Sequence, residues 1–107
     1  MSAFTFEMLE ALIEQRAQSG GETSYTAQLV AAGPQRIAKK LGEEGVEAAL
    51  ACAQGDEDEL RAEAADLLYH MLVALHVRGI RLKEVLDELA RRTGQSGLEE
   101  KASRRTQ

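Results

Sequence analysis

The 107-residue chain is poor in the residue types that mark several protein classes. It has one cysteine, one proline, two tyrosines, two phenylalanines and no tryptophan. The lone Cys52 excludes a disulfide framework and a cysteine zinc site, and the lone Pro34 excludes a proline-rich linker. No apolar run approaches the roughly 18 residues of a membrane span, and the acidic N-terminus lacks the basic start of a secretory signal. We therefore expect a cytoplasmic protein without a membrane partner, with the whole chain as its mature form.

Bulky apolar side chains are also scarce. Hydrophobic residues make up 44% of the chain, but 17 of them are alanines. Small side chains that pack closely favour helices, and a core with so little bulky surface favours association between subunits. The length suits one domain that covers residues 1–107. The sequence therefore predicts a single helical domain that forms a homodimer.

The charges are distributed unevenly along the chain, whose net charge is −5. Nine of the 18 acidic residues lie between Glu43 and Asp66, and eight of the 13 basic residues lie from Arg78 onward. A protein that binds nucleic-acid phosphates directly does not place such an acidic block at its centre, so we expect no nucleic-acid partner. A bound cation would invert this argument, because carboxylates that hold a cation can bind a phosphate through it.

Apolar residues at helical spacing, together with capping residues and glycines, divide the chain into helices. Thr5 and Asp56 are suited to cap helix starts, and Pro34 is suited to a first helical position. The expected helices run from residue 6 to the glycines at 20 and 21, and then over 26–32, 34–54, 57–78 and 82–92. Residues 94–107 form a polar, basic tail, and no segment has the pattern of a strand. The predicted fold is an all-α antiparallel bundle of about four to five helices.

Acidic side chains adjoin the predicted buried faces of two helices. On a helical wheel, Glu44 falls in the middle of an apolar stripe that consists of Ile37, Leu41, Ala48 and Cys52. Glu47 lies one turn further along the same side. In the next long helix the apolar stripe consists of Leu60, Ala64, Leu67 and Met71. Its border carries Glu63, Asp66 and His70.

The spacing of these acids predicts that they meet. Two antiparallel helices joined by a short turn bring residues equidistant from the turn to the same level. Glu44 and Asp66 are equidistant from Gly55, and so are Glu47 and Glu63. Unpaired negative charge between two helices costs several kcal/mol, so something positive has to lie there. Oxygen ligands in this number suit Mg²⁺, or Mn²⁺, with coordination sites left for water and a substrate phosphate.

Other residues beside the acids allow two interpretations each. Gly42 and Gly45 flank a pair of glutamates inside a predicted helix, where glycine is about 1 kcal/mol less favourable than alanine. Close approach of another helix or a nearby phosphate would explain them. Lys39 and Lys40 either contact phosphates or balance the neighbouring acids. His70 either orients a carboxylate or water near the acids, or is a structural histidine with satisfied hydrogen bonds.

Two segments of the chain are similar to a known superfamily. Lys39–Glu47 (KKLGEEGVE) and Glu63–His70 (EAADLLYH) resemble the all-α nucleoside-triphosphate pyrophosphohydrolases. Within that superfamily the chain resembles the phosphoribosyl-ATP pyrophosphohydrolases. This narrower resemblance rests on Ser24-Tyr25-Thr26, on the run Asp66–His70 and on the tail segment Gly97–Arg104. It covers most of the chain from Ser24 to Arg104, and no acid position departs from the pattern.

The resemblance implies a dimeric enzyme that hydrolyses phosphoribosyl-ATP to phosphoribosyl-AMP and pyrophosphate, the second step of histidine biosynthesis. It implies catalytic Mg²⁺ held by Glu44, Glu47, Glu63 and Asp66. Glu43 is a further catalytic candidate, for a second metal ion or for positioning water. The candidates for substrate contacts are Lys39, Lys40, His70, Lys101 and Arg104, with Arg105 beside them. The alternative within the superfamily is a house-cleaning enzyme that hydrolyses non-standard nucleoside triphosphates.

Two functions outside the superfamily also suit a helical domain with inward acids. A carboxylate-bridged di-iron bundle needs Glu-x-x-His turns, whereas the residues three positions after Glu44 and Glu63 are acids. A non-enzymatic helical adaptor requires no aligned acids, and Mg²⁺ binding with pyrophosphate release would exclude it.

Overall fold

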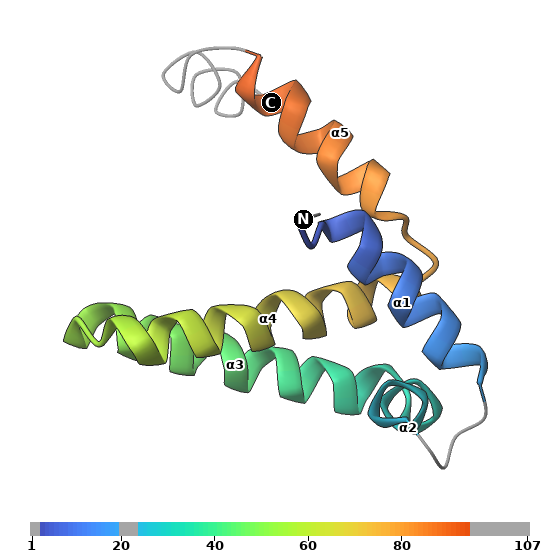
Figure 1. The fold of residues 1–107 in the computed structure, drawn as a ribbon, viewed down its shortest axis with the longest axis horizontal. Helices are drawn as coiled ribbons and strands as arrows, with labels where there is room; N and C mark the ends of the chain where they lie inside the picture. Colours follow the sequence, from blue (N-terminus) through green and yellow to red (C-terminus); the bar gives the residue numbers. More distant parts are fainter. Residues whose placement is uncertain (1–2, 20–23, 95–107) are drawn as a thin grey trace.

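The computed structural model describes residues 3–19 and 24–94, and it contains helices and no strand in these ranges (Figure 1). The helices are α1 (Phe6–Gln18), α2 (Tyr25–Ala32), α3 (Pro34–Gln54), α4 (Glu57–Val77) and α5 (Leu82–Thr93). The predicted all-α class is therefore confirmed. Within the described residues, no helix combines the length and apolar character needed to cross a membrane.

The helix starts follow from local capping. The Met8 N–H donates to Thr5 Oγ1 over 3.1 Å, and the Glu59 N–H donates to Asp56 Oδ1 over 3.1 Å. Both predicted caps are confirmed, and Pro34 is the first residue of α3 as predicted. Helix α2 begins at Tyr25, one residue before the predicted start, because Ser24 Oγ accepts a hydrogen bond from the Ala27 N–H over 3.2 Å.

Helices α3 and α4 form a long antiparallel hairpin that turns at Gly55 (Figure 1). Gly55 has φ +74°, a left-handed conformation that glycine adopts without the steric cost of a side chain. Its N–H donates to the Cys52 carbonyl over 3.2 Å, and the next N–H donates to the Ala51 carbonyl over 3.1 Å, which closes the end of α3. The turn therefore lies where the sequence predicts it, and the register of the hairpin follows from it.

The apolar core lies at one end of the hairpin. It consists of Ile13 from α1, Leu29 from α2, Ile37 from α3, Leu72 and Val73 from α4, and Leu82 from α5. Figure 1 shows α1 and α2 against this end of the hairpin, while the end with the turn extends away from them. The antiparallel packing thus concerns α3 and α4 above all, and the three shorter helices close one end of the pair.

The structure corrects the predicted faces of α3 and α4. Cys52 is exposed and Ala51 is buried in its place. Met71 is 41% exposed, whereas Glu63 and His70, predicted at the border of the stripe, are 8% and 5% exposed. Apolar residues flank this face of α4 on both sides, so the helical wheel alone does not determine how α4 is rotated about its axis. The core contacts of Leu72 and Val73 fix it instead.

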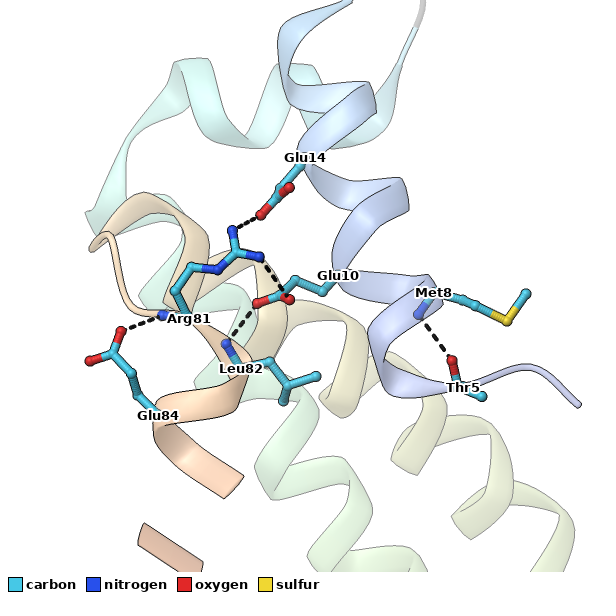
Figure 2. Close-up of polar contacts among 7 residues, drawn as sticks. All are labelled: Thr5, Met8, Glu10, Glu14, Arg81, Leu82 and Glu84. Atoms are coloured by element: carbon cyan, nitrogen blue, oxygen red, sulfur yellow. Dashed lines mark hydrogen bonds and ion pairs between the residues drawn. The ribbon is translucent and has the colours of Figure 1, made fainter. Parts of the chain in front are cut away.

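Helix α5 is attached to α1 at its first turn (Figure 2). The guanidinium of Arg81 donates to Glu10 over 3.3 Å and also forms an ion pair with Glu14. The Leu82 N–H donates to Glu10 Oε2 over 2.6 Å, and the Arg81 N–H donates to Glu84 Oε2 over 2.8 Å. These bonds satisfy two of the free N–H groups at the start of α5. Figure 1 shows the rest of this helix leading away from the hairpin.

Candidate functional site

Three of the four predicted acids come together inside the hairpin. Carboxylate oxygens of Glu44 on α3 and of Glu63 and Asp66 on α4 lie within 4.8 Å of one another. Glu63 is buried, Glu44 is half-buried and Asp66 is exposed, so the cluster is closed on one side and open on the other. The predicted pairing of Glu44 with Asp66 across the hairpin is therefore present in the structure.

Two of these carboxylates have buried oxygens without a partner. Oε2 of Glu44 and Oε2 of Glu63 are inaccessible to water and accept no hydrogen bond from any described residue. Burying an ionised carboxylate without a partner is costly, and a native fold does not often retain such a group without a reason. A cation is the group that carboxylates this close together are suited to bind.

The fourth acid, Glu47, affects the ionisation of Glu63. The pKa of Glu63 is raised from 4.5 to about 8, mainly by a hydrogen bond between the two side chains and next by burial. The negative charges of Glu47, Glu44 and Glu59 add to this effect, because each opposes the ionisation of Glu63. The cluster thus holds a proton in place of a positive partner, and the register that aligns Glu47 with Glu63 is as predicted.

The donor set of the cluster fits a hard divalent cation. All the ligand atoms on offer are carboxylate oxygens, which suit Mg²⁺ or Mn²⁺ better than the softer metals that prefer sulfur or imidazole. Three clustered carboxylates leave coordination positions free, and the exposed side at Asp66 gives a ligand access to them. The arrangement can therefore hold a cation that binds a phosphate group at the same time.

The other candidates on α3 lie outside the cluster. Glu43 is exposed and its Oε1 lies 4.0 Å from Lys40 Nζ, so this lysine balances a neighbouring acid. Lys39 and Glu43 border a shallow surface hollow that also includes Gly42, Val46 and Glu47. A side-chain carbon added at Gly42 would meet no described atom within 4 Å, so close packing of another described helix does not explain the glycine.

His70 is buried beside the acids, and both of its ring nitrogens have partners. Its Nδ1 lies 2.8 Å from the Asp66 carbonyl oxygen, and its Nε2 lies 3.2 Å from the Tyr25 hydroxyl. Sequence reasoning missed this link to Tyr25, because no spacing rule connects residues 45 positions apart. The only signal was that both residues belong to segments that carry the family resemblance.

Two further parts of the chain bear on where the site lies. The predicted contacts Lys101, Arg104 and Arg105 lie outside the described residues. A cavity of about 360 Å³ lies between α1 and the end of α4, lined among others by Glu10 and Glu14. The acids in this cavity are neutralised by Arg81, whereas those of the hairpin are not, so the acid cluster is the candidate site.

The raised pKa of Glu63 predicts how stability depends on pH. Between its ordinary value of 4.5 and about 8, Glu63 is protonated in the folded protein and ionised in the unfolded chain. Unfolding then releases a proton, so the metal-free protein should lose stability as pH rises through this range. Glu88 titrates below this pH range, because hydrogen bonds from Arg91 and Arg92 hold its pKa at about 2. Thermal unfolding in EDTA at several pH values measures the effect.

The control for this experiment is a pair of variants. Glu63→Gln removes the titrating group and should flatten the loss of stability between pH 4.5 and about 8. Glu57→Gln makes the same change at an exposed side chain in the first turn of α4 and should keep the wild-type slope. Equal slopes for all three proteins would contradict the assigned burial and crowding of Glu63.

Comparison with known proteins identifies the family. The family model for phosphoribosyl-ATP pyrophosphohydrolase matches residues 6–93. A phosphoribosyl-ATP pyrophosphatase of Methylobacterium nodulans is 58% identical over 98% of this chain and 98% of its own length. Proteins of the same name from Agrobacterium fabrum and Rhizobium rhizogenes are 56% and 55% identical, over 99% and 97% of this chain and 99% and 100% of their own lengths. The chain therefore belongs to the phosphoribosyl-ATP pyrophosphohydrolase family.

Proposed function

We propose that this protein hydrolyses phosphoribosyl-ATP to phosphoribosyl-AMP and pyrophosphate with a divalent cation, Mg²⁺ or Mn²⁺, held by the acid cluster. The observation that carries the proposal is the pair of buried carboxylate oxygens, on Glu44 and Glu63, that have no partner among the described residues. Membership of the family supports phosphoribosyl-ATP as the substrate, because relatives that match nearly the whole chain are named phosphoribosyl-ATP pyrophosphatase. The same name implies that the reaction belongs to histidine biosynthesis.

The residues of the cluster have distinct parts in this proposal. Glu44, Glu63 and Asp66 would hold the cation, and Glu47 would keep the carboxyl group of Glu63 in place from the next turn of α3. When bound, the cation neutralises the triphosphate and lowers the pKa of a water molecule. Hydrolysis adds water across the bond between the α- and β-phosphates, so the products are phosphoribosyl-AMP and pyrophosphate. The exposed side of the cluster admits the triphosphate.

The basic and acidic side chains on the outer side of α3 have secondary parts. Lys39 is exposed and forms no ion pair within the described ranges, so its ammonium group is available to a phosphate that the cation leaves uncovered. Lys40 pairs with Glu43, and the carboxylate of Glu43 is not part of the acid cluster. Glu43 therefore suits positioning of water at the edge of the site better than holding the first cation.

Glu44→Gln should abolish most turnover of phosphoribosyl-ATP. The substitution keeps the shape of the side chain and removes the charge that the cation needs, so pyrophosphate release should fall by about a hundredfold or more. The same change at Glu57, an exposed residue outside the cluster, should leave the rate unchanged. Pyrophosphate release with phosphoribosyl-ATP, ATP and dUTP at equal Mg²⁺ concentration measures both the effect and the substrate preference.

The assay also separates the proposed function from the house-cleaning alternative. The proposed function requires much faster hydrolysis of phosphoribosyl-ATP than of ATP or dUTP. Turnover of dUTP without turnover of phosphoribosyl-ATP would reject the substrate while keeping the acid cluster as the site. Full activity of Glu44→Gln would reject the cluster itself.

We propose that the hairpin pairs with that of a second copy. Several apolar side chains of the hairpin are exposed: Val46 (60%) and Leu50 (54%) on α3, and Leu68 (44%) and Met71 (41%) on α4. Apolar side chains gathered on one pair of helices are typical of a surface that another protein covers. The turn end of the hairpin extends beyond α1 and α2, so none of the described helices covers it (Figure 1). A homodimer also suits a chain with 17 alanines and only four aromatic residues.

Leu68→Glu should shift the protein from dimer to monomer. A charge placed in an apolar interface has to be buried without a partner, which costs several kcal/mol and exceeds what a small interface provides. Gln54→Glu adds the same charge at an exposed polar position of α3 and should leave the dimer intact. Light scattering at micromolar concentration measures the mass of each variant. A wild-type monomer with full activity would contradict the proposed dimer.

A further inference from the structure

A row of charged side chains runs along α3 from the acid cluster toward the start of the helix. Residues three or four positions apart lie on the same face of a helix, and this spacing places Arg36, Lys40, Glu43 and Glu47 in one row. The ion pair between Lys40 and Glu43, at 4.0 Å, joins the middle of this charged row. The side chain of Glu47 forms a hydrogen bond with that of Glu63, so one end of the charged row meets the acid cluster.

Arg36, at the other end of the charged row, is exposed and forms no ion pair with any acid in residues 3–19 and 24–94. Most other basic side chains in these ranges are paired with acids: Lys40, Arg61, Arg81, Lys83, Arg91 and Arg92. Arg16 interacts with Tyr69, and Arg78 lies at the C-terminal end of α4. Within the charged row, Arg36 is therefore the group that can bind an anion from outside the chain.

The charges along the row describe a ligand. At one end, a cation held by the acid cluster would bind an anionic group. In the middle, Lys40 neutralises Glu43, so this part suits an uncharged group. At the far end, Arg36 lies about 12 Å from Glu44 along the helix axis, because each residue of a helix adds about 1.5 Å. A complementary ligand has an anionic group at each end and an uncharged part between them.

We propose that Arg36 determines substrate specificity by binding the phosphate on the second ribose of phosphoribosyl-ATP. The inference rests on the proposed function. Phosphoribosyl-ATP carries a triphosphate at one end, a purine between two riboses, and a second phosphate at the other end. In an extended form the purine and riboses are long enough to cover the roughly two helical turns between Glu44 and Arg36.

An arginine suits this contact because its planar guanidinium donates two parallel hydrogen bonds to a phosphate. In this arrangement the triphosphate lies at the acid cluster, and the purine lies beside the pair of Lys40 and Glu43. ATP and dUTP have no second phosphate, so the contact with Arg36 stabilises bound phosphoribosyl-ATP and neither of these nucleotides. Arg36 thus selects the substrate without a part in the chemical step.

Arg36→Gln tests the proposal, with Arg78→Gln as the matched control. Loss of a charged contact with a phosphate should raise KM for phosphoribosyl-ATP about tenfold to a hundredfold and change kcat by less than about twofold. Arg36→Lys keeps the charge without the paired donors, so its KM should lie between those of the wild type and Arg36→Gln. Arg78→Gln removes the same charge at the end of α4 and should leave both constants unchanged. Steady-state pyrophosphate release at constant Mg²⁺ and ionic strength measures both constants. An unchanged KM in Arg36→Gln, or an equal rise in Arg78→Gln, would overturn the proposal.

An analogue of phosphoribosyl-ATP that lacks only the second phosphate identifies the group that Arg36 binds. The wild type should show a raised KM for this analogue, and Arg36→Gln should cause no further rise, because the contact is already lost. A further rise as large as that with phosphoribosyl-ATP would assign Arg36 to the triphosphate and overturn the proposal. If the wild type hydrolyses dUTP and not phosphoribosyl-ATP, the proposed function fails. If it hydrolyses phosphoribosyl-ATP with the same KM as Arg36→Gln, this inference alone fails.

Discussion

Carboxylates held within 4.8 Å of one another between two helices repel each other, and the rest of the structure has to hold them together. The hairpin turn at Gly55 sets the register that places Glu44 opposite Asp66 and Glu47 opposite Glu63. Without a cation the cluster reduces its charge by raising the pKa of Glu63, which keeps a proton between two acids. The arrangement is unfavourable for folding, and such arrangements persist where function requires them.

The core and the candidate site occupy different parts of the hairpin. Ile37 and Val73 belong to the apolar core that α1 and α2 close, whereas the acids lie further toward the turn. The apolar core therefore stabilises one end of the hairpin, and the acids that repel one another lie toward the other end. His70 connects the two regions, since it is buried next to the core residues Leu72 and Val73 and bonds to Asp66 through its Nδ1.

Sequence reasoning succeeded where local rules fix the structure. The caps at Thr5 and Asp56 and the turn at Gly55 depend on a few neighbouring residues, so they were predictable, and the meeting of the acids followed from the turn. The rotation of α4 was not predictable, because the contacts of Leu72 and Val73 with other helices decide it. Helical periodicity alone therefore placed Met71 inside and Glu63 at the border, which is wrong.

The contact between Tyr25 and His70 was beyond sequence reasoning for a different reason. It joins residues 45 positions apart, and the chain folds back through two helix boundaries before they meet. Gly42 and Gly45 also lack an explanation among the described residues, because added side-chain carbons would meet none of their atoms within 4 Å. A substrate or a second copy that approaches α3 would explain both glycines.

The central claim is that the hairpin acids hold a divalent cation. Anomalous diffraction from crystals soaked in Mn²⁺ tests it most directly, because the signal locates the ion without reference to activity. The account predicts an ion bound by oxygens of Glu44, Glu63 and Asp66. A Mn²⁺ ion bound elsewhere, with no signal between these carboxylates in crystals of the active enzyme, would contradict it.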